Sequence, residues 1–180
     1  MSASGWSRRP WGWHPLVDEW AARIVADALV EPGELVVDLG AGEGALTAHL
    51  VAAGAHVVSV ELHAGRVQML RERFASAQVT VVRCDIAGFR LPRRPFRVVA
   101  SPPYAMSSAV LRSLLTPRSR LVAADLVLQR AVVRRVCEGR APGSGTWLRE
   151  FDVRPGRTLP RRAFRPPPRV DSAVLVVRRR

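Results

Sequence analysis

Lysine is absent from this sequence, and all 28 of its basic residues are arginine. Cysteine is scarce, since Cys84 and Cys137 are the two cysteines in 180 residues. Two cysteines are too few for a disulfide framework, and they form no CxxC or Cys/His spacing of the kind that binds zinc. The sequence therefore predicts neither a disulfide scaffold nor a metal site.

Long apolar segments are also lacking. The longest apolar stretches have roughly the length of one strand, whereas a membrane span needs about 20 residues. The residues after Met1 are rich in Trp and Arg and form no apolar signal segment. With 48% hydrophobic residues the chain can build a core, and its length favours one domain. These features predict a cytoplasmic protein that does not associate with membranes.

The balance of charge is strongly basic, with a net charge of +13. A biased genome composition explains why Arg replaces Lys, but it does not explain an excess of base over acid. Such an excess indicates a polyanionic partner, and the planar guanidinium of Arg suits phosphate. Nucleic acid is favoured over an acidic membrane surface, because no basic amphipathic helix stands out in the sequence.

Short apolar segments alternate with amphipathic helical patterns along most of the chain. We expect helices over residues 17–29, 45–53, 65–74, 107–115 and 129–138. We expect strands over residues 35–38, 56–60, 79–83, 96–100, 121–128, 147–153 and 173–177. The alternation predicts an α/β fold with a doubly wound, mostly parallel sheet that ends in an antiparallel edge hairpin. Residues 1–15 are expected to form a basic, aromatic arm, and residues 16–180 the domain itself.

A glycine-rich turn, Gly40–Gly44, lies where the first strand meets the next helix. Glycines there let the backbone turn sharply and approach a ligand closely, beside the free N–H groups of a helix N-terminus. The spacing Gly40-x-Gly42-x-x-Ala45 also satisfies a loose dinucleotide-binding pattern, for which Glu61 lies at the offset of a ribose-binding acid. The turn alone leaves a nicotinamide-dependent oxidoreductase and a purely structural turn open.

Three acidic residues at the ends of successive strands favour S-adenosylmethionine as the cofactor. Asp38 is placed to orient the methionine amino group, Glu61 to accept hydrogen bonds from both ribose hydroxyls, and Asp85 to accept one from the adenine amino group. One such acid would be interpreted as a helix cap or a solvated carboxylate, but ligands of open α/β sheets collect at the strand ends where all three fall. The predicted cofactor contacts here are Asp38, Gly40, Gly42, Glu61, Leu62, Asp85, Ile86 and Ser101.

Ser101-Pro102-Pro103-Tyr104 follows the fourth strand. Two consecutive prolines hold the backbone extended and remove two N–H donors, which leaves acceptors beside an aromatic ring. An adenine amino group is a poor nucleophile because its lone pair is delocalised. The Ser101 hydroxyl and the Pro102 carbonyl would accept its hydrogens, and Tyr104 would stack on the flipped base. The tetrapeptide predicts methyl transfer to this amino group by positioning and electrostatics, with catalytic residues Ser101, Pro102 and Tyr104.

With these motifs the chain resembles the Erm/KsgA family of rRNA adenine N6-methyltransferases. The resemblance covers nearly the whole chain, and its most specific mark is the Phe-x-Pro-x-Pro-x-Val pattern that begins at Phe164. It implies a Rossmann-like S-adenosylmethionine-dependent methyltransferase fold. Within the family the chain is most similar to the short mycobacterial Erm-type proteins. The implied target is therefore an adenine of 23S rRNA, whose methylation confers resistance to macrolide, lincosamide and streptogramin antibiotics.

The chain departs from the family pattern in three ways. Most members have Asn where this chain has Ser101, and a Gln-Asn-Phe-Leu stretch where this chain has residues 12–15. We therefore expect Trp13 or His14 to replace the usual Asn contact to the cofactor. We also expect the family's small C-terminal helical domain to be absent and the protein to act as a monomer. The residues then predicted to contact RNA are Arg8, Arg9, Arg134, Arg135, Arg161, Arg162 and Phe164.

Other interpretations remain open at this point. For Phe164, packing at the sheet edge fits as well as a place in the wall of the base pocket. A 16S rRNA dimethyladenosine transferase or a DNA adenine methyltransferase would share the motifs named above. A catalytically idle RNA-binding assembly factor could keep the same fold, although the intact acids and the Pro-Pro-Tyr stretch argue against it.

Overall fold

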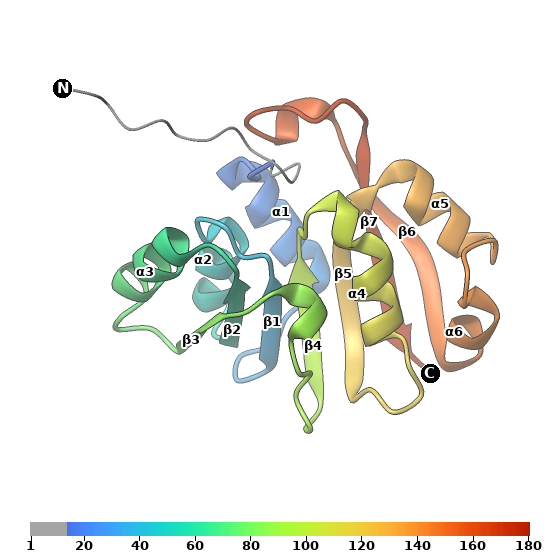
Figure 1. Cartoon of the computed structure of the whole chain (residues 1–180), viewed down its shortest axis with the longest axis horizontal. Helices are drawn as coiled ribbons and strands as arrows, with labels where there is room; N and C mark the ends of the chain where they lie inside the picture. The colour runs from blue at the N-terminus through green and yellow to red at the C-terminus, as the bar shows by residue number, and fades with distance from the viewer. Residues whose placement is uncertain (1–13) are drawn as a thin grey trace.

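The computed structural model describes residues 14–180 (Figure 1). The predicted contacts of Arg8, Arg9 and Trp13, and nearly all of the predicted arm, lie outside the described residues. Between residues 14 and 180, no helix is long and apolar enough to cross a bilayer.

The described residues contain one seven-stranded sheet with the order β3-β2-β1-β4-β5-β7-β6. Its strands are β1 (Leu35–Leu39), β2 (His56–Glu61), β3 (Val79–Arg83), β4 (Phe96–Ala100), β5 (Leu121–Gln129), β6 (Phe151–Leu159) and β7 (Ser172–Arg179). Strands β1 to β5 pair in parallel, and β7 runs antiparallel between β5 and β6. The predicted α/β class, with a mostly parallel doubly wound sheet and an antiparallel edge hairpin, is confirmed.

Helices cover both faces of the sheet. They are α1 (Asp18–Ala28), α2 (Ala45–Ala52), α3 (Ala64–Arg73), α4 (Ser107–Leu114), α5 (Arg130–Cys137) and α6 (Ser144–Glu150). Helices α1 and α2 bury apolar residues against one face, and α4, α5 and α6 bury theirs against the other. Helix α1 illustrates the cause, because its buried residues recur at helical spacing and acidic side chains occupy its first turn.

The direction of the strand order reverses at β1, which pairs in parallel with β2 on one side and β4 on the other. The chain runs outward from β1 to β3 and then returns to β4. The carboxyl ends of β1 and β4 therefore meet at the reversal point, which is where ligands of open α/β sheets bind. Asp38, near the end of β1, and Ser101, directly after β4, reach this same edge of the sheet.

The edge hairpin differs from the prediction in its boundaries. Residues 144–150 form helix α6, and the strand expected over residues 147–153 begins only at Phe151 and continues to Leu159. Trp147 and Phe151 are spaced for one helical turn, and both are buried in the core on the α4–α6 face. Pro155 is tolerated because β6 is an edge strand with a register shift between Pro155 and Thr158. The few apolar residues between positions 147 and 153 therefore fit a helix and a strand equally in the sequence alone.

Residues 163–165, which precede β7, form backbone hydrogen bonds with the start of the described chain. The Val17 amide donates to the Ala163 carbonyl (2.9 Å), and the Arg165 amide donates to the Pro15 carbonyl (3.0 Å). An antiparallel bridge joins Leu16 to Phe164 between these two bonds. Residues 14–17 are therefore fixed beside the crevice by contacts with residues 163–165.

We expect Gly44→Ala to destabilise the protein by about 3 kcal/mol, which corresponds to a fall in Tm of roughly 6–12 °C for a protein of this size. Gly44 has φ +84°, and an added Cβ would lie 2.8 Å from side-chain atoms of both Leu70 and Phe74, which are buried. Gly33→Ala is the matched control, because Gly33 also has φ +84° but no atom within 4 Å of the added Cβ. It should cost only about 1 kcal/mol. Equal losses in urea unfolding of the two variants would contradict the packing role of Gly44.

Candidate active site

The glycine turn after β1 is held against the end of β2. The amides of Gly40 and Ala41 both donate to the Val60 carbonyl (2.8 and 3.0 Å), and the Gly42 amide donates to Glu61 Oε2 (2.9 Å). Gly40 and Gly42 have φ values of +77° and +59°, which favour glycine. These three amides thus fix the loop on β2, and Gly40 stays partly exposed.

Asp38 is buried at the floor of the crevice. Its carboxylate accepts a hydrogen bond from Thr47 Oγ1 (2.8 Å), and the Thr47 hydroxyl also shares a hydrogen bond with Ser59 Oγ (2.8 Å). Burial raises the pKa of Asp38 to about 7, the hydrogen bond from Thr47 opposes this rise, and the nearby Glu61 carboxylate adds to it. A cationic group of a ligand placed beside Asp38 would favour its charged form.

Glu61 is the last residue of β2, and both of its carboxylate oxygens accept hydrogen bonds from backbone amides. Oε2 accepts from Gly42, and Oε1 accepts from the His63 amide (2.8 Å), while Arg66 Nη1 lies 3.7 Å from Oε1. Each oxygen keeps a second acceptor direction, so Glu61 can still accept hydrogen bonds from hydroxyl groups. The backbone bonds hold its carboxylate rigidly at the strand end.

Asp85 and the two predicted apolar contacts lie further along the same edge. Asp85 is exposed, and its Oδ1 caps the short helix η1 (Ile86–Gly88) by accepting from the Ala87 amide (2.9 Å). Ile86 reaches back toward the glycine turn, because its Cδ1 lies 3.5 Å from the position of a Cβ on Gly40. Leu62 is 58% exposed, so its side chain is accessible to a ligand.

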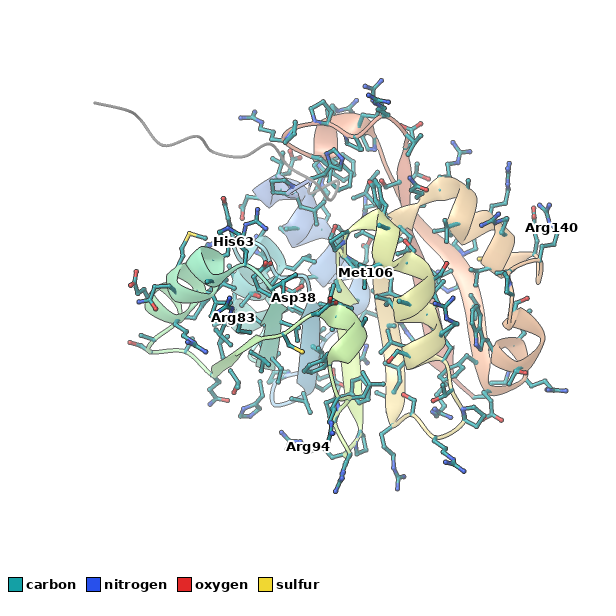
Figure 2. The ribbon with its side chains drawn as sticks, viewed as in Figure 1. Asp38, His63, Arg83, Arg94, Met106 and Arg140 are labelled. Carbon is teal, nitrogen blue, oxygen red and sulfur yellow. The ribbon has the colours of Figure 1, made fainter. Side chains whose placement is uncertain are left out.

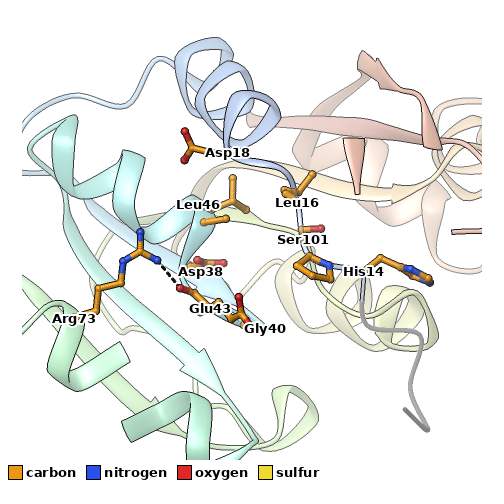
Figure 3. A pocket seen from close by; sticks show the side chains of 13 residues that line it. His14, Leu16, Asp18, Asp38, Gly40, Glu43, Leu46, Arg73 and Ser101 are labelled. Atoms are coloured by element: carbon orange, nitrogen blue, oxygen red, sulfur yellow. Dashed lines mark hydrogen bonds between the residues drawn. The ribbon is translucent and has the colours of Figure 1, made fainter. Parts of the chain in front are cut away.

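A cavity of about 220 Å³ lies between the start of the described chain, the glycine turn and the residue after β4 (Figure 3). Five residues predicted to contact the cofactor line it, and they are His14, Asp38, Gly40, Gly42 and Ser101. Glu61, Leu62, Asp85 and Ile86 are not part of its lining. The structure therefore brings one half of the predicted site into a single cavity and leaves the other half on the adjoining edge.

The tetrapeptide after β4 packs directly against the glycine turn. A Cβ on Gly40 would lie 3.2 Å from Pro103 Cδ and 3.5 Å from Pro102 Cα. Pro102 is buried, and Tyr104 begins the short helix η2 (Tyr104–Met106). The two motifs, which are about sixty residues apart in the sequence, thus lie in direct contact, and Ser101 lines the same cavity as Gly40 and Gly42.

Tyr104 is anchored from β7. Its hydroxyl shares a hydrogen bond of 2.5 Å with Ser172 Oγ, and burial raises the pKa of Tyr104 above its usual value although that bond opposes the rise. Ser172 is fully buried at the first position of β7. Ser172, Thr47 and Ser59 were not among the residues predicted from the sequence to belong to the site. Ser172 follows the Phe-x-Pro-x-Pro-x-Val pattern, but its contact with Tyr104 depends on tertiary structure.

The residues predicted to bind RNA differ in how far they are exposed. Arg134 and Arg135 are exposed on α5, and Arg162 is exposed before β7. Arg161 donates through Nε to the Pro168 carbonyl (2.7 Å), so part of its guanidinium serves the local loop. Phe164 is 2% exposed and packs with Leu16 in the core beneath α1, so the prediction that it contacts RNA is wrong.

The geometry fits S-adenosylmethionine. A buried carboxylate lies in the cavity for an ammonium group, and a rigid acceptor ends β2 for hydroxyl groups. Gly40 and Gly42, which have no side chains, let a ligand approach the backbone of the turn. A seven-stranded sheet of this order with such a site defines the class of S-adenosylmethionine-dependent methyltransferases. The family described as ribosomal RNA adenine dimethylase matches residues 9–180. The chain therefore belongs to this family of S-adenosylmethionine-dependent methyltransferases.

Relatives from both branches of the family match the chain. An rRNA adenine N-6-methyltransferase from Corynebacterium diphtheriae is 33% identical over 99% of this chain and 71% of its own length. A ribosomal RNA small subunit methyltransferase A from Acidobacterium capsulatum is 34% identical over 96% of this chain and 65% of its own length. The solved structure of the 23S rRNA methyltransferase ErmE superposes with a TM-score of 0.84 and 30% identity, over 92% of this chain and 69% of that one. The chain thus spans about two thirds of the length of these relatives.

Proposed function

We propose that this protein methylates the exocyclic amino group of an adenine in ribosomal RNA. The observation that carries the proposal is the contact of the glycine turn with Ser101–Tyr104, in which the Cβ position of Gly40 lies 3.2 Å from Pro103 Cδ. A cofactor bound at the glycine turn would therefore lie next to a base bound at the tetrapeptide. Such a juxtaposition serves group transfer between two bound molecules.

The chain's own residues would act by positioning. Bound S-adenosylmethionine would supply the methyl group from its sulfonium centre and become S-adenosylhomocysteine, and the methylated amino group would release one proton to water. The Ser101 hydroxyl and the Pro102 carbonyl would accept the hydrogens of the adenine amino group and draw its lone pair out of conjugation. Tyr104 would stack on the base, which must leave its helix to reach the crevice.

We further propose 23S rRNA as the substrate, in keeping with the resemblance to Erm-type proteins. The likeness to the 23S rRNA methyltransferase ErmE supports it, as does that to the Corynebacterium relative. The alternative is a 16S rRNA dimethyladenosine transferase. It is supported by the Acidobacterium small-subunit enzyme, which is about as similar in sequence to this chain as the Corynebacterium relative is. Methylation of 23S rRNA at the macrolide site would confer resistance, because it adds bulk and removes hydrogen-bonding capacity where the drug docks.

Two measurements test the proposal. Expression in a macrolide-sensitive host should raise resistance, and primer extension on its ribosomal RNA should stop at one adenine of the peptidyl-transferase loop. A stop in 16S rRNA with unchanged susceptibility would transfer the assignment to the small-subunit reaction. If the purified protein labels no rRNA with radioactive S-adenosylmethionine, the methyltransferase proposal is contradicted.

We expect RNA binding to weaken steeply with salt, because arginine contacts with phosphate release counterions. The logarithm of affinity should fall with the logarithm of salt concentration by about 0.7–0.9 per phosphate contacted. The double variant Arg134→Ala/Arg135→Ala should reduce this slope by about 1–2 units. Arg94→Ala is the matched control, because Arg94 precedes β4 at the edge of the sheet opposite Ser101 (Figure 2). A salt-independent affinity would contradict RNA binding through arginine side chains.

A further inference from the structure

Exposed arginines gather at the edge of the sheet opposite the catalytic residues. Two of them precede β4 and two precede β5, and they are Arg93, Arg94, Arg118 and Arg120. The two loops are neighbours, because β4 and β5 pair in parallel and the Phe96 amide donates to the Arg120 carbonyl (3.3 Å). Arg94 lies at the lower edge in Figure 2, below Asp38. These four residues are called the far-edge patch below.

The positive charge of the far-edge patch is not neutralised by acidic side chains. None of its guanidinium groups takes part in the ion pairs of residues 14–180. Acidic residues at the same edge of the sheet pair with other arginines, and these pairs are Glu34–Arg97, Glu150–Arg179 and Asp152–Arg180. The patch therefore presents a local excess of positive charge, which attracts a polyanion.

The backbone beneath the patch is fixed by contacts within the protein. Pro92 and Pro95 flank the first two arginines and restrict the backbone of the loop before β4. Arg179 of β7 holds the loop before β5, because its Nη2 donates to the Ser119 carbonyl (2.7 Å) and its Nε to the Leu121 carbonyl (2.8 Å). A ligand of the patch therefore has to order only arginine side chains, which lowers the entropic cost of binding.

We propose that the far-edge patch binds phosphates of a second segment of the substrate rRNA, separate from the segment that carries the target adenine. The inference rests on the proposed function, because it takes rRNA as the polyanion. The patch and Ser101 lie at opposite ends of neighbouring strands, and the nine residues of β5 span roughly 25–30 Å. An RNA that contacts both edges must pass around the molecule. The patch therefore favours a folded domain of rRNA over a minimal stem-loop.

The chemistry of the patch fits RNA better than a lipid surface. Proteins that lie on membranes insert Trp, Phe or Leu side chains beside their basic residues. Phe96 and Leu121, which follow the two loops directly, are buried. The planar guanidinium of Arg forms paired hydrogen bonds with phosphate, and phosphate contacts fix the position of an RNA on a protein without reading its sequence. The patch would thus help to place the target adenine at the catalytic edge.

Two double variants of the full chain test the inference. Arg93→Gln/Arg94→Gln and Arg118→Gln/Arg120→Gln each remove two charges from one loop. For a folded domain of 23S rRNA free of ribosomal proteins, each should raise the Kd about tenfold and lower the salt slope by about 1–2 units in filter-binding titrations. For a minimal stem-loop with the target adenine, each should leave KM and kcat within about twofold. Arg94→Ala is neutral for such a stem-loop for the same reason.

Arg71→Gln/Arg154→Gln is the matched control. It removes the same total charge from exposed positions on α3 and β6, away from the two loops. Its Kd for the folded rRNA domain should stay within about threefold of the wild-type value, because long-range charge effects are screened by salt. This control separates the far-edge patch from the net charge of the whole protein.

Four results would overturn the inference. One is a wild-type Kd and salt slope of both double variants on the folded rRNA domain. Another is an equal loss in the control variant, which would assign the effect to net charge. An equal loss on the stem-loop would mean that these arginines bind the target segment. Finally, unchanged rRNA binding together with lost retention on phosphatidylserine vesicles would assign the patch to a lipid surface.

Failure of the proposed function gives a different result. The wild-type protein would then label no rRNA with radioactive S-adenosylmethionine. The Kd values and salt slopes do not depend on methyl transfer, so they still decide whether the far-edge patch binds RNA. If labelling succeeds and the double variants bind the rRNA domain as the wild type does, the proposed function stands and the inference alone is wrong.

Discussion

Tyr104→Ala is expected to lower methyl transfer to rRNA by at least about 100-fold while the affinity for S-adenosylhomocysteine changes by less than about threefold. The ring would stack on the target base, and its removal leaves that base without a fixed distance to the methyl donor. Tyr104 is not part of the cavity lined by Asp38 and Ser101, so the cofactor should still bind. Single-turnover transfer and isothermal titration calorimetry measure the two quantities separately.

Tyr104→Phe and Ser172→Ala are the matched controls for this result. Each removes the shared hydrogen bond but keeps the ring of residue 104 aromatic, so each should cost only about 2–10-fold in kcat/KM. The double variant should cost no more than either single variant, because both changes break the same bond. If Tyr104→Ala abolishes cofactor binding together with transfer, Tyr104 is a structural residue and its assignment as a stacking residue fails.

Residues that follow parallel strands could be located from the sequence. Asp38, Glu61 and Ser101 each stand directly at or after an apolar segment that alternates with a helix, and the carboxyl ends of such strands share one edge of the sheet. Their meeting in space therefore follows from local patterns and one rule of topology. The contact between Gly40 and Pro103 is a consequence of the same rule, because β1 and β4 are neighbours at the reversal of strand order.

Contacts through the last strand could not be located in this way. Ser172 meets Tyr104 across 68 residues, and the meeting depends on the antiparallel pairing of β7 with β5. Phe164 carries the most specific family pattern, yet its burial depends on the bridge to Leu16 near the other end of the chain. The sequence predicted too early a start for β6 for a related reason. The apolar pattern of the residues before Phe151 fits both a helix and an extended strand, and tertiary packing decides between the two.

The buried state of Asp38 predicts how cofactor affinity depends on pH. Because burial raises the pKa of Asp38 to about 7, the carboxyl group is mostly protonated below this pH and mostly charged above it. The cofactor's ammonium group should bind the charged form. The affinity for S-adenosylhomocysteine should therefore be constant above pH 7 and fall by up to about tenfold per pH unit below it, because binding must first remove the proton. Calorimetry between pH 5.5 and 8.5 measures this profile.

Variants of Asp38 and Thr47 assign the profile to this one group. Asp38→Asn should bind the cofactor at least about tenfold more weakly at pH 8 and lose the dependence on pH, because the amide carries no charge to be titrated. Thr47→Val removes the hydrogen bond that favours the charged carboxylate, so the break in the profile should move to higher pH. Thr47→Ser keeps the hydroxyl and should leave the break near its original pH. A wild-type affinity that is constant from pH 5.5 to 8.5 would show that Asp38 does not hold the ammonium group, and the amino end of the cofactor would have to be bound by other residues of the crevice.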